Sequence, residues 1–146
     1  MAILSAENNF KKGLLAIVDE NFEEAARCFR RAIDIQEQRS AGRPDWRYLS
    51  YYGLSLAKAT RPSEEAIAAC RSAAANHPTN LDLVLNLARV YRIAGKYDRA
   101  AEAVAHGLRV RPDHPSLLEE SRLLRVAMAS PSAVGFPRDW SRRRTA

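Results

Sequence analysis

An internal repeat of 34 residues is the feature that most restricts how this chain can fold. Pro44, Pro78 and Pro112 follow one another at this distance, and so do Ala66 and Ala100. Self-similarity at one fixed period is typical of a repeat architecture, in which similar units stack in a row and bury their apolar faces against each other.

An earlier copy of the unit lies out of phase with the other two. It reads NFEEAARCFRRAIDI, and its Ala25 takes the place of Ala66 at a distance of 41 residues instead of 34. The surplus falls mostly in the stretch QEQRSAGRP, which is polar and contains Gly and Pro. We therefore expect a lengthened connection between the first and second units.

Each unit is predicted to contain two helices. Apolar residues such as Leu83, Leu87 and Tyr91 recur at helical spacing, and the alternation typical of strands is absent. Only six glycines and seven prolines occur in 146 residues, which also favours helix. The first helices of the units are expected at 4–18, 45–60 and 80–94, and the second helices at 21–38, 63–76 and 97–110.

Capping patterns mark several of the expected helix starts. Asn21 precedes Glu24 at the three-residue spacing of a capping box, or of a variant of it. The same spacing separates the pairs Thr79 and Asp82, and Ser116 and Glu119.

Residues at fixed places in each unit resemble the tetratricopeptide repeat family. The third copy carries the family pattern at Leu87, Ala88, Tyr91, Gly95, Tyr97, Ala100 and Pro112. The second carries it at Leu49, Tyr52, Gly53, Leu56, Ala66, Ala73 and Pro78. The first has Gly13, Phe22, Ala25, Phe29 and Ala32, but departs from the pattern at Asn9 and Lys12.

This resemblance implies an all-α fold, a right-handed superhelix of antiparallel helix pairs. The repeats are expected at about 4–38, 45–78 and 79–112, and small residues such as Gly53 and Ala66 should let paired helices approach closely. Residues 114–128 form an amphipathic pattern that we interpret as a helix capping the third repeat, so the repeat domain spans 1–128. The remaining segment, 129–146, is expected to be a mobile basic tail.

Composition and motifs argue against several function classes. No apolar run approaches the roughly 20 residues that span a bilayer, and no secretory signal opens the chain, so a cytoplasmic protein without a membrane span is expected. The spacing of His77, His106 and His114 fits no metal-ligand signature. No catalytic motif stands out, so we expect neither an enzyme nor a cofactor or metal. Cys28 and Cys70 are expected to be buried, reduced thiols.

The resemblance also implies a function. In the family, the first helices of the repeats line a concave groove that binds a peptide or protein segment. We therefore expect a protein-interaction module, an adaptor or assembly scaffold, whose partner carries apolar and acidic residues. Carried over position by position, the partner-binding residues are Phe10, Leu14, Arg47, Tyr51, Leu54, Lys58, Asn86 and Arg89, with Ile93 and Arg122 as further candidates.

Some family members bind the carboxylate ends of chaperones through a clamp of Lys and Asn. Here Phe10 and Leu14 occupy the places of that Lys and Asn in the first repeat, and Tyr51 occupies the place of an Asn in the second. This departure disfavours a chaperone co-factor role.

Two alternatives remain open from the sequence. The tail combines Phe136 and Trp140 with four arginines against one aspartate, and the whole chain carries a net charge of +6. Such a segment could bind nucleic acid or another anionic surface, although nucleic acid is the less expected partner. Repeat faces can also stack end to end, so a homo-oligomer is possible.

Overall fold

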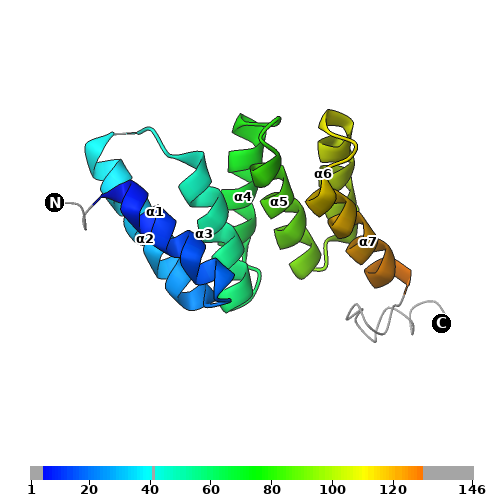
Figure 1. Cartoon of the computed structure of the whole chain (residues 1–146), viewed down its shortest axis with the longest axis horizontal. Coiled ribbons are helices and arrows are strands. Elements are labelled where there is room, and N and C mark those ends of the chain that lie inside the picture. Colours follow the sequence, from blue (N-terminus) through cyan, green and yellow to red (C-terminus); the bar gives the residue numbers. More distant parts are fainter. Residues whose placement is uncertain (1–4, 41, 130–146) are drawn as a thin grey trace.

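Seven α-helices make up the part of the chain that the computed structural model describes, residues 5–40 and 42–129 (Figure 1). They form three pairs and one single helix, and no strand occurs among these residues. The predicted all-α solenoid is confirmed, and each helix end lies within two residues of its expected position. The helices are α1 (Ala6–Val18), α2 (Phe22–Arg39), α3 (Trp46–Ala59), α4 (Glu64–Asn76), α5 (Leu81–Ile93), α6 (Tyr97–Val110) and α7 (Pro115–Ala129).

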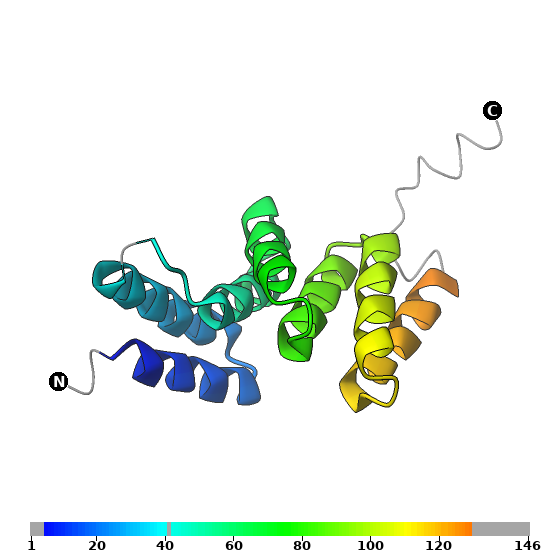
Figure 2. The ribbon, with the colours of Figure 1, turned by 90° about the horizontal axis from the view of Figure 1, so that it is seen from above.

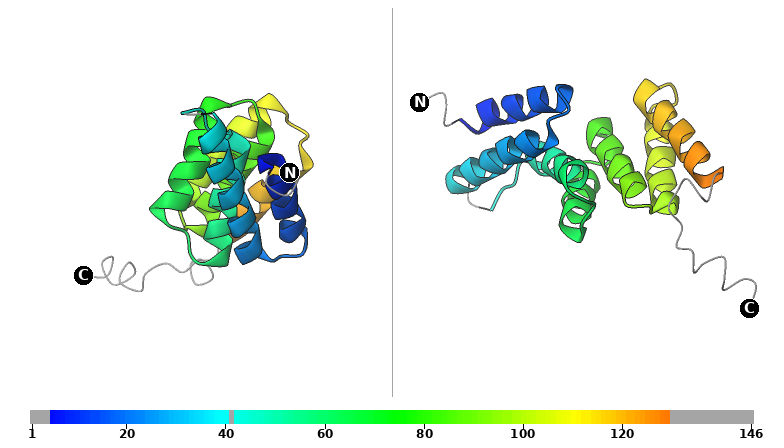
Figure 3. Two further views of the ribbon diagram at one scale, coloured as in Figure 1. Left: turned by 90° about the vertical axis from the view of Figure 1, so that its left-hand side faces the viewer. Right: turned by 90° about the horizontal axis from the view of Figure 1, so that it is seen from below.

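The pairs follow one another along the long axis of the molecule, as Figures 2 and 3 show from two sides. Each second helix packs against the first helix of the next pair, so that α2 contacts α3, α4 contacts α5, and α6 contacts α7. Among the described residues, no helix is long and apolar enough to cross a membrane. The predicted basic tail lies outside the described residues, except that Ala129 ends α7.

Helix starts agree with the capping prediction at one of three places. The side chain of Asn21 accepts a hydrogen bond from the backbone N–H of Glu24 at 3.2 Å, as expected. The prediction for Thr79 is wrong, because the cap of α5 is Asn80, which accepts from two backbone N–H groups. Ser116 is also not a cap, because α7 already begins at Pro115. Proline suits the first helical position, where no N–H donor is required.

Small residues bring paired helices into close contact, as predicted. Ala25, Ala66, Ala88 and Ala100 have no exposed surface. A Cβ atom placed on Gly53 would lie 2.6 Å from the carbonyl oxygen of Ala66, so only glycine fits at this crossing of α3 and α4.

The first repeat departs from the regular stack. The backbones of α3 and α5 lie close together, whereas α1 and α3 make far fewer close approaches. An aromatic cluster of Phe10, Phe29, Tyr48 and Tyr51 fills this space, with ring centroids 5.0 to 5.8 Å apart. Between α1 and α3, large rings therefore take the place of the close backbone contact that α3 makes with α5.

Candidate partner-binding surface

The first helices of the pairs, α1, α3 and α5, together with α7, present the surface on which the partner-binding residues were predicted. We call it the A-helix face. The structure divides the eight predicted residues into two groups. Leu14, Arg47, Tyr51, Lys58 and Arg89 are exposed or half-buried, whereas Phe10, Leu54 and Asn86 are buried.

The three buried residues belong to the core. Because their side chains are covered by the chain itself, they are not available to a partner, contrary to the prediction. Phe10 lies in the aromatic cluster between α1 and α3, and Leu54 packs in the core formed around α3, α4 and α5. Asn86 is 1% exposed, and its side-chain amide donates a hydrogen bond to Ser50 Oγ at 3.0 Å. This bond satisfies a polar group that would be costly to bury alone, and it links α5 to α3.

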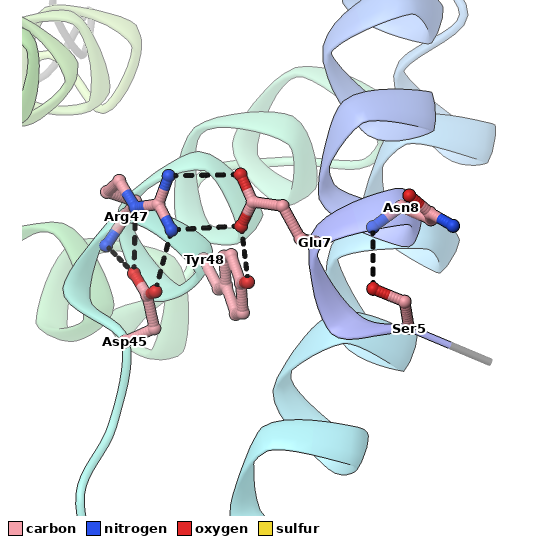
Figure 4. A network of polar contacts seen from close by, with 6 residues as sticks. All are labelled: Ser5, Glu7, Asn8, Asp45, Arg47 and Tyr48. Atoms are coloured by element: carbon pink, nitrogen blue, oxygen red, sulfur yellow. Dashed lines mark hydrogen bonds and ion pairs between the residues drawn. The ribbon is translucent and has the colours of Figure 1, made fainter. Parts of the chain in front are cut away.

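Arg47 is held in a network that joins α1 to α3 (Figure 4). Its guanidinium contacts Asp45 at 2.9 Å and Glu7 at 3.0 Å, and lies 4.9 Å from the centre of the Phe10 ring. Hydrogen bonds from Arg47 and Tyr48 lower the pKa of Glu7. Burial and the bond to Glu7 raise the pKa of Tyr48. Arg47 is therefore engaged within the chain, as a bridge between the first two repeats.

Replacing Glu7 by glutamine should lower the free energy of unfolding at neutral pH by about 1 kcal/mol, since this carboxylate is partly exposed. A carboxyl group whose pKa is lowered on folding stabilises the folded state above its unfolded pKa, and this contribution is lost as the pH falls through the folded value. The difference between wild type and Glu7→Gln should therefore shrink below pH 4.5, the ordinary pKa of this group. Urea unfolding at several pH values measures it.

Glu37→Gln is the matched control, because Glu37 is exposed and makes no ion pair among the described residues. A difference between wild type and Glu7→Gln that stays constant down to pH 3 would contradict the role assigned to the bridge.

A hollow of about 420 Å³ opens on the other half of the A-helix face, between α3, α5 and α7. We call it the basic hollow. The cations Lys58, Arg89 and Arg92 line it, together with Glu119 and Glu120. Two of the predicted residues, Lys58 and Arg89, therefore come together here.

Glu120 lies at the base of this arrangement and is 2% exposed. Its carboxylate accepts two hydrogen bonds from Arg92, at 2.7 and 2.9 Å, and lies 3.6 Å from Arg89. The bidentate geometry fixes the Arg92 guanidinium, and the hydrogen bond to Glu120 raises its pKa. One buried carboxylate thus orients two arginines at the edge of the hollow.

The basic hollow keeps a surplus of positive charge. Glu120 can neutralise only one of the three cations, and Glu119 is already bound by Arg122 on the same helix at 2.6 Å. Burial, followed by the nearby charges of Arg89 and Arg92, lowers the pKa of Lys58. No carboxylate lies within ion-pair distance of Lys58 among the described residues, and its ammonium sits 4.8 Å from the centre of the Phe22 ring. An added anion would relieve this repulsion.

Sequence reasoning missed Arg92 and Glu120. Arg92 follows Arg89 by three residues, so helical spacing could have placed both on one face. Nothing in the sequence indicates that Glu120 is buried, because it lies in a run of polar residues. The two remaining candidates contribute less: Ile93 packs against the core, and Arg122 is bound to Glu119.

The two cysteines are buried, and two of the histidines contact backbone groups. Cys28 and Cys70 are buried and unpaired, as predicted, and burial raises the pKa of Cys70 to about 12. His106 Nε2 lies 2.7 Å from the carbonyl oxygen of Pro78, and His114 Nδ1 accepts from the backbone N–H of Leu117. Across residues 5–40 and 42–129, no three His, Cys, Asp or Glu side chains are grouped so that they could hold a metal.

Comparison with known proteins agrees with this geometry. One model of the tetratricopeptide repeat matches residues 10–80, from α1 to the start of the third repeat, and a second matches residues 63–119, from α4 into α7. No curated protein matches the chain. The matches cover all three helix pairs and agree with the observed stack, and the chain belongs to the tetratricopeptide repeat family.

Proposed function

We propose that this chain is an adaptor or assembly subunit whose basic hollow binds an acidic segment of a partner protein. Tetratricopeptide repeats generally act as protein–protein interaction modules, and they are typically non-catalytic. On this chain, the basic hollow is the binding site and the partner segment is acidic.

The observation that carries the proposal is the unbalanced charge of the basic hollow. Three cations surround one buried carboxylate, and two of them, Arg89 and Arg92, are oriented by it. A preorganised cationic site binds a carboxylate with little loss of side-chain freedom. Acidic side chains of a partner supply the missing negative charge, and the half-buried Tyr51 and Leu14 offer apolar contacts further along the same face.

Combining Lys58→Glu with Arg89→Gln should weaken the binding of an acidic peptide by about tenfold to a hundredfold, because each change removes a charge-assisted contact. The probe is a fluorescent peptide with an apolar half followed by aspartates and glutamates, and fluorescence anisotropy measures its affinity. Glutamine is chosen at position 89 because a second carboxylate beside the buried Glu120 would disturb the fold.

Arg61→Glu combined with Arg109→Gln serves as the matched control, since it changes the net charge by the same amount and both arginines are exposed and do not line the hollow. The control should bind within about twofold of wild type. If both double variants lose the same affinity for the peptide, the loss is caused by the overall charge of the protein, and the basic hollow is not the binding site.

Self-association is a second candidate, favoured by apolar side chains exposed at both ends of the stack. Leu15 and Val18 on α1 are 66% and 77% exposed, and Val126 and Met128 on α7 are 57% and 47% exposed. Terminal units of a solenoid usually carry polar outer faces. The oligomeric state in solution tests this candidate. Binding through the tail remains a prediction about residues outside those described.

A further inference from the structure

A second groove is lined by residues of α4, α5 and α6. These three helices follow one another along the stack (Figure 1). The volume of the groove is about 620 Å³, compared with about 420 Å³ for the basic hollow. Leu87 and Tyr91 of α5 line it. Helical periodicity places them on nearly the opposite side of α5 from Arg89 and Arg92. We call it the B-helix groove, and it shares no lining residue with the basic hollow.

The groove has an apolar centre. Leu87 of α5 is half-buried there, and small side chains, Ala74 and Ala75 of α4 and Ala103 of α6, stand on either side of it. Alanines leave room for a large side chain from outside, because they do not fill the space between neighbouring helices.

A polar contact joins the walls at one end of the groove, and the other end is basic. At the first end, the His106 ring lies 2.7 Å from the carbonyl oxygen of Pro78. At the other end stand Arg71 and Arg99, both exposed and both without an ion pair among the described residues. Glu102 also lines this part of the groove, so the rim keeps one net positive charge.

Tyr91 supplies a polar group at the same end. Tyr91 is 6% exposed and lines the groove. Its phenol hydroxyl is able to donate a hydrogen bond to a carboxylate.

We propose that the B-helix groove is a second docking site, which takes a partner segment with one large apolar side chain beside a carboxylate. The apolar side chain lies on Leu87 between the alanine walls, and the carboxylate lies between Arg71, Arg99 and the Tyr91 hydroxyl. The chain's own tail is a poor occupant, because four arginines against one aspartate repel a basic rim. With both sites filled, the chain would join two partners across its stack.

The test uses 4-phenylbutyrate, which combines a phenyl ring with a carboxylate, and the full chain labelled with nitrogen-15. A ligand of this size should bind with a dissociation constant of about 1 mM. Amide shifts should be confined to α4, α5 and α6 around the groove. The uncharged analogue 4-phenylbutan-1-ol should bind at least about threefold more weakly, since it lacks the carboxylate.

Two variants separate the parts of the site. Arg71→Gln with Arg99→Gln should weaken the acid by about fivefold or more, while Arg61→Gln with Arg109→Gln should leave it unchanged. Ala75→Phe should fill the groove and abolish binding of both probes, and circular dichroism should show its fold intact, because Ala75 is exposed.

The proposal is overturned if the probe shifts map to the basic hollow, if the alcohol binds as tightly as the acid, or if the Arg71 and Arg99 variant binds normally. It is also overturned if groove amides shift with protein concentration alone, because a second copy would then be the occupant. None of these outcomes affects the acidic-peptide experiment on the A-helix face, which the Lys58 and Arg89 variants test separately.

Discussion

Replacing Gly53 by alanine is expected to lower the free energy of unfolding by about 3 kcal/mol. A methyl group at this position would lie 2.6 Å from the Ala66 carbonyl oxygen and 2.8 Å from Cys70 Sγ, so α3 and α4 must move apart. At an open helical position the same change would stabilise by up to about 1 kcal/mol. A loss at Gly53 therefore has the opposite sign from helix propensity. Urea unfolding followed by circular dichroism measures it.

Gly107→Ala is the matched control. Its added methyl would meet Leu117 Cδ1 at 2.7 Å, which is the end of a flexible side chain and not a backbone atom. Because Leu117 can adjust its side chain, we expect less than half of the loss seen for Gly53→Ala. If both glycines tolerate alanine equally, the close crossing of α3 and α4 does not limit stability.

Replacing Glu120 by glutamine should cost about 2 to 3 kcal/mol. The change removes the carboxylate that Arg92 binds through two hydrogen bonds and leaves three cations facing one another. Breaking a buried ion pair costs more than this when both partners are buried, but the Arg92 side chain is 26% exposed. The same variant should bind the acidic peptide several-fold more tightly, provided that it is folded, because the basic hollow gains one positive charge.

A double replacement tests this explanation. Glu120→Leu with Arg92→Met removes both charges and keeps apolar volume, so its stability should return to within about 1 kcal/mol of wild type. If the double variant is less stable than Glu120→Gln, the loss arises from packing around α7 and not from unpaired charge.

The repeat period made the positions of the helices predictable. Successive helix pairs must have similar lengths in order to stack, so the ends of one pair indicate the ends of the next. The period also predicted the close approach at Gly53, where a small residue stands opposite Ala66. It did not predict that Phe10 is buried. The orientation of α1 relative to α3 depends on the lengthened connection and on the rings that fill the space, and neither follows from a family pattern.

The surroundings of the predicted partner-binding residues could not be read from the sequence, for a similar reason. Lys58 and Arg89 line the same hollow, but Arg47 is bound by Glu7, which lies 40 residues earlier. Pairing of charges across helices depends on side-chain reach in three dimensions. For that reason, a row of helix positions can indicate which face carries a site but not which of its charges are free.

The contacts between neighbouring repeats also dictate the order in which the repeats can be joined. Phe10 and Ser50 stand three residues before the glycines of α1 and α3, so they occupy matching places in successive repeats. Each meets a residue from the following repeat: Phe10 lies against the ring of Tyr51, whereas Ser50 accepts from the amide of Asn86. Exchanging the repeats would set an aromatic ring against a buried amide and leave that amide unpaired. The three units are therefore not interchangeable modules, and only their natural succession satisfies both junctions.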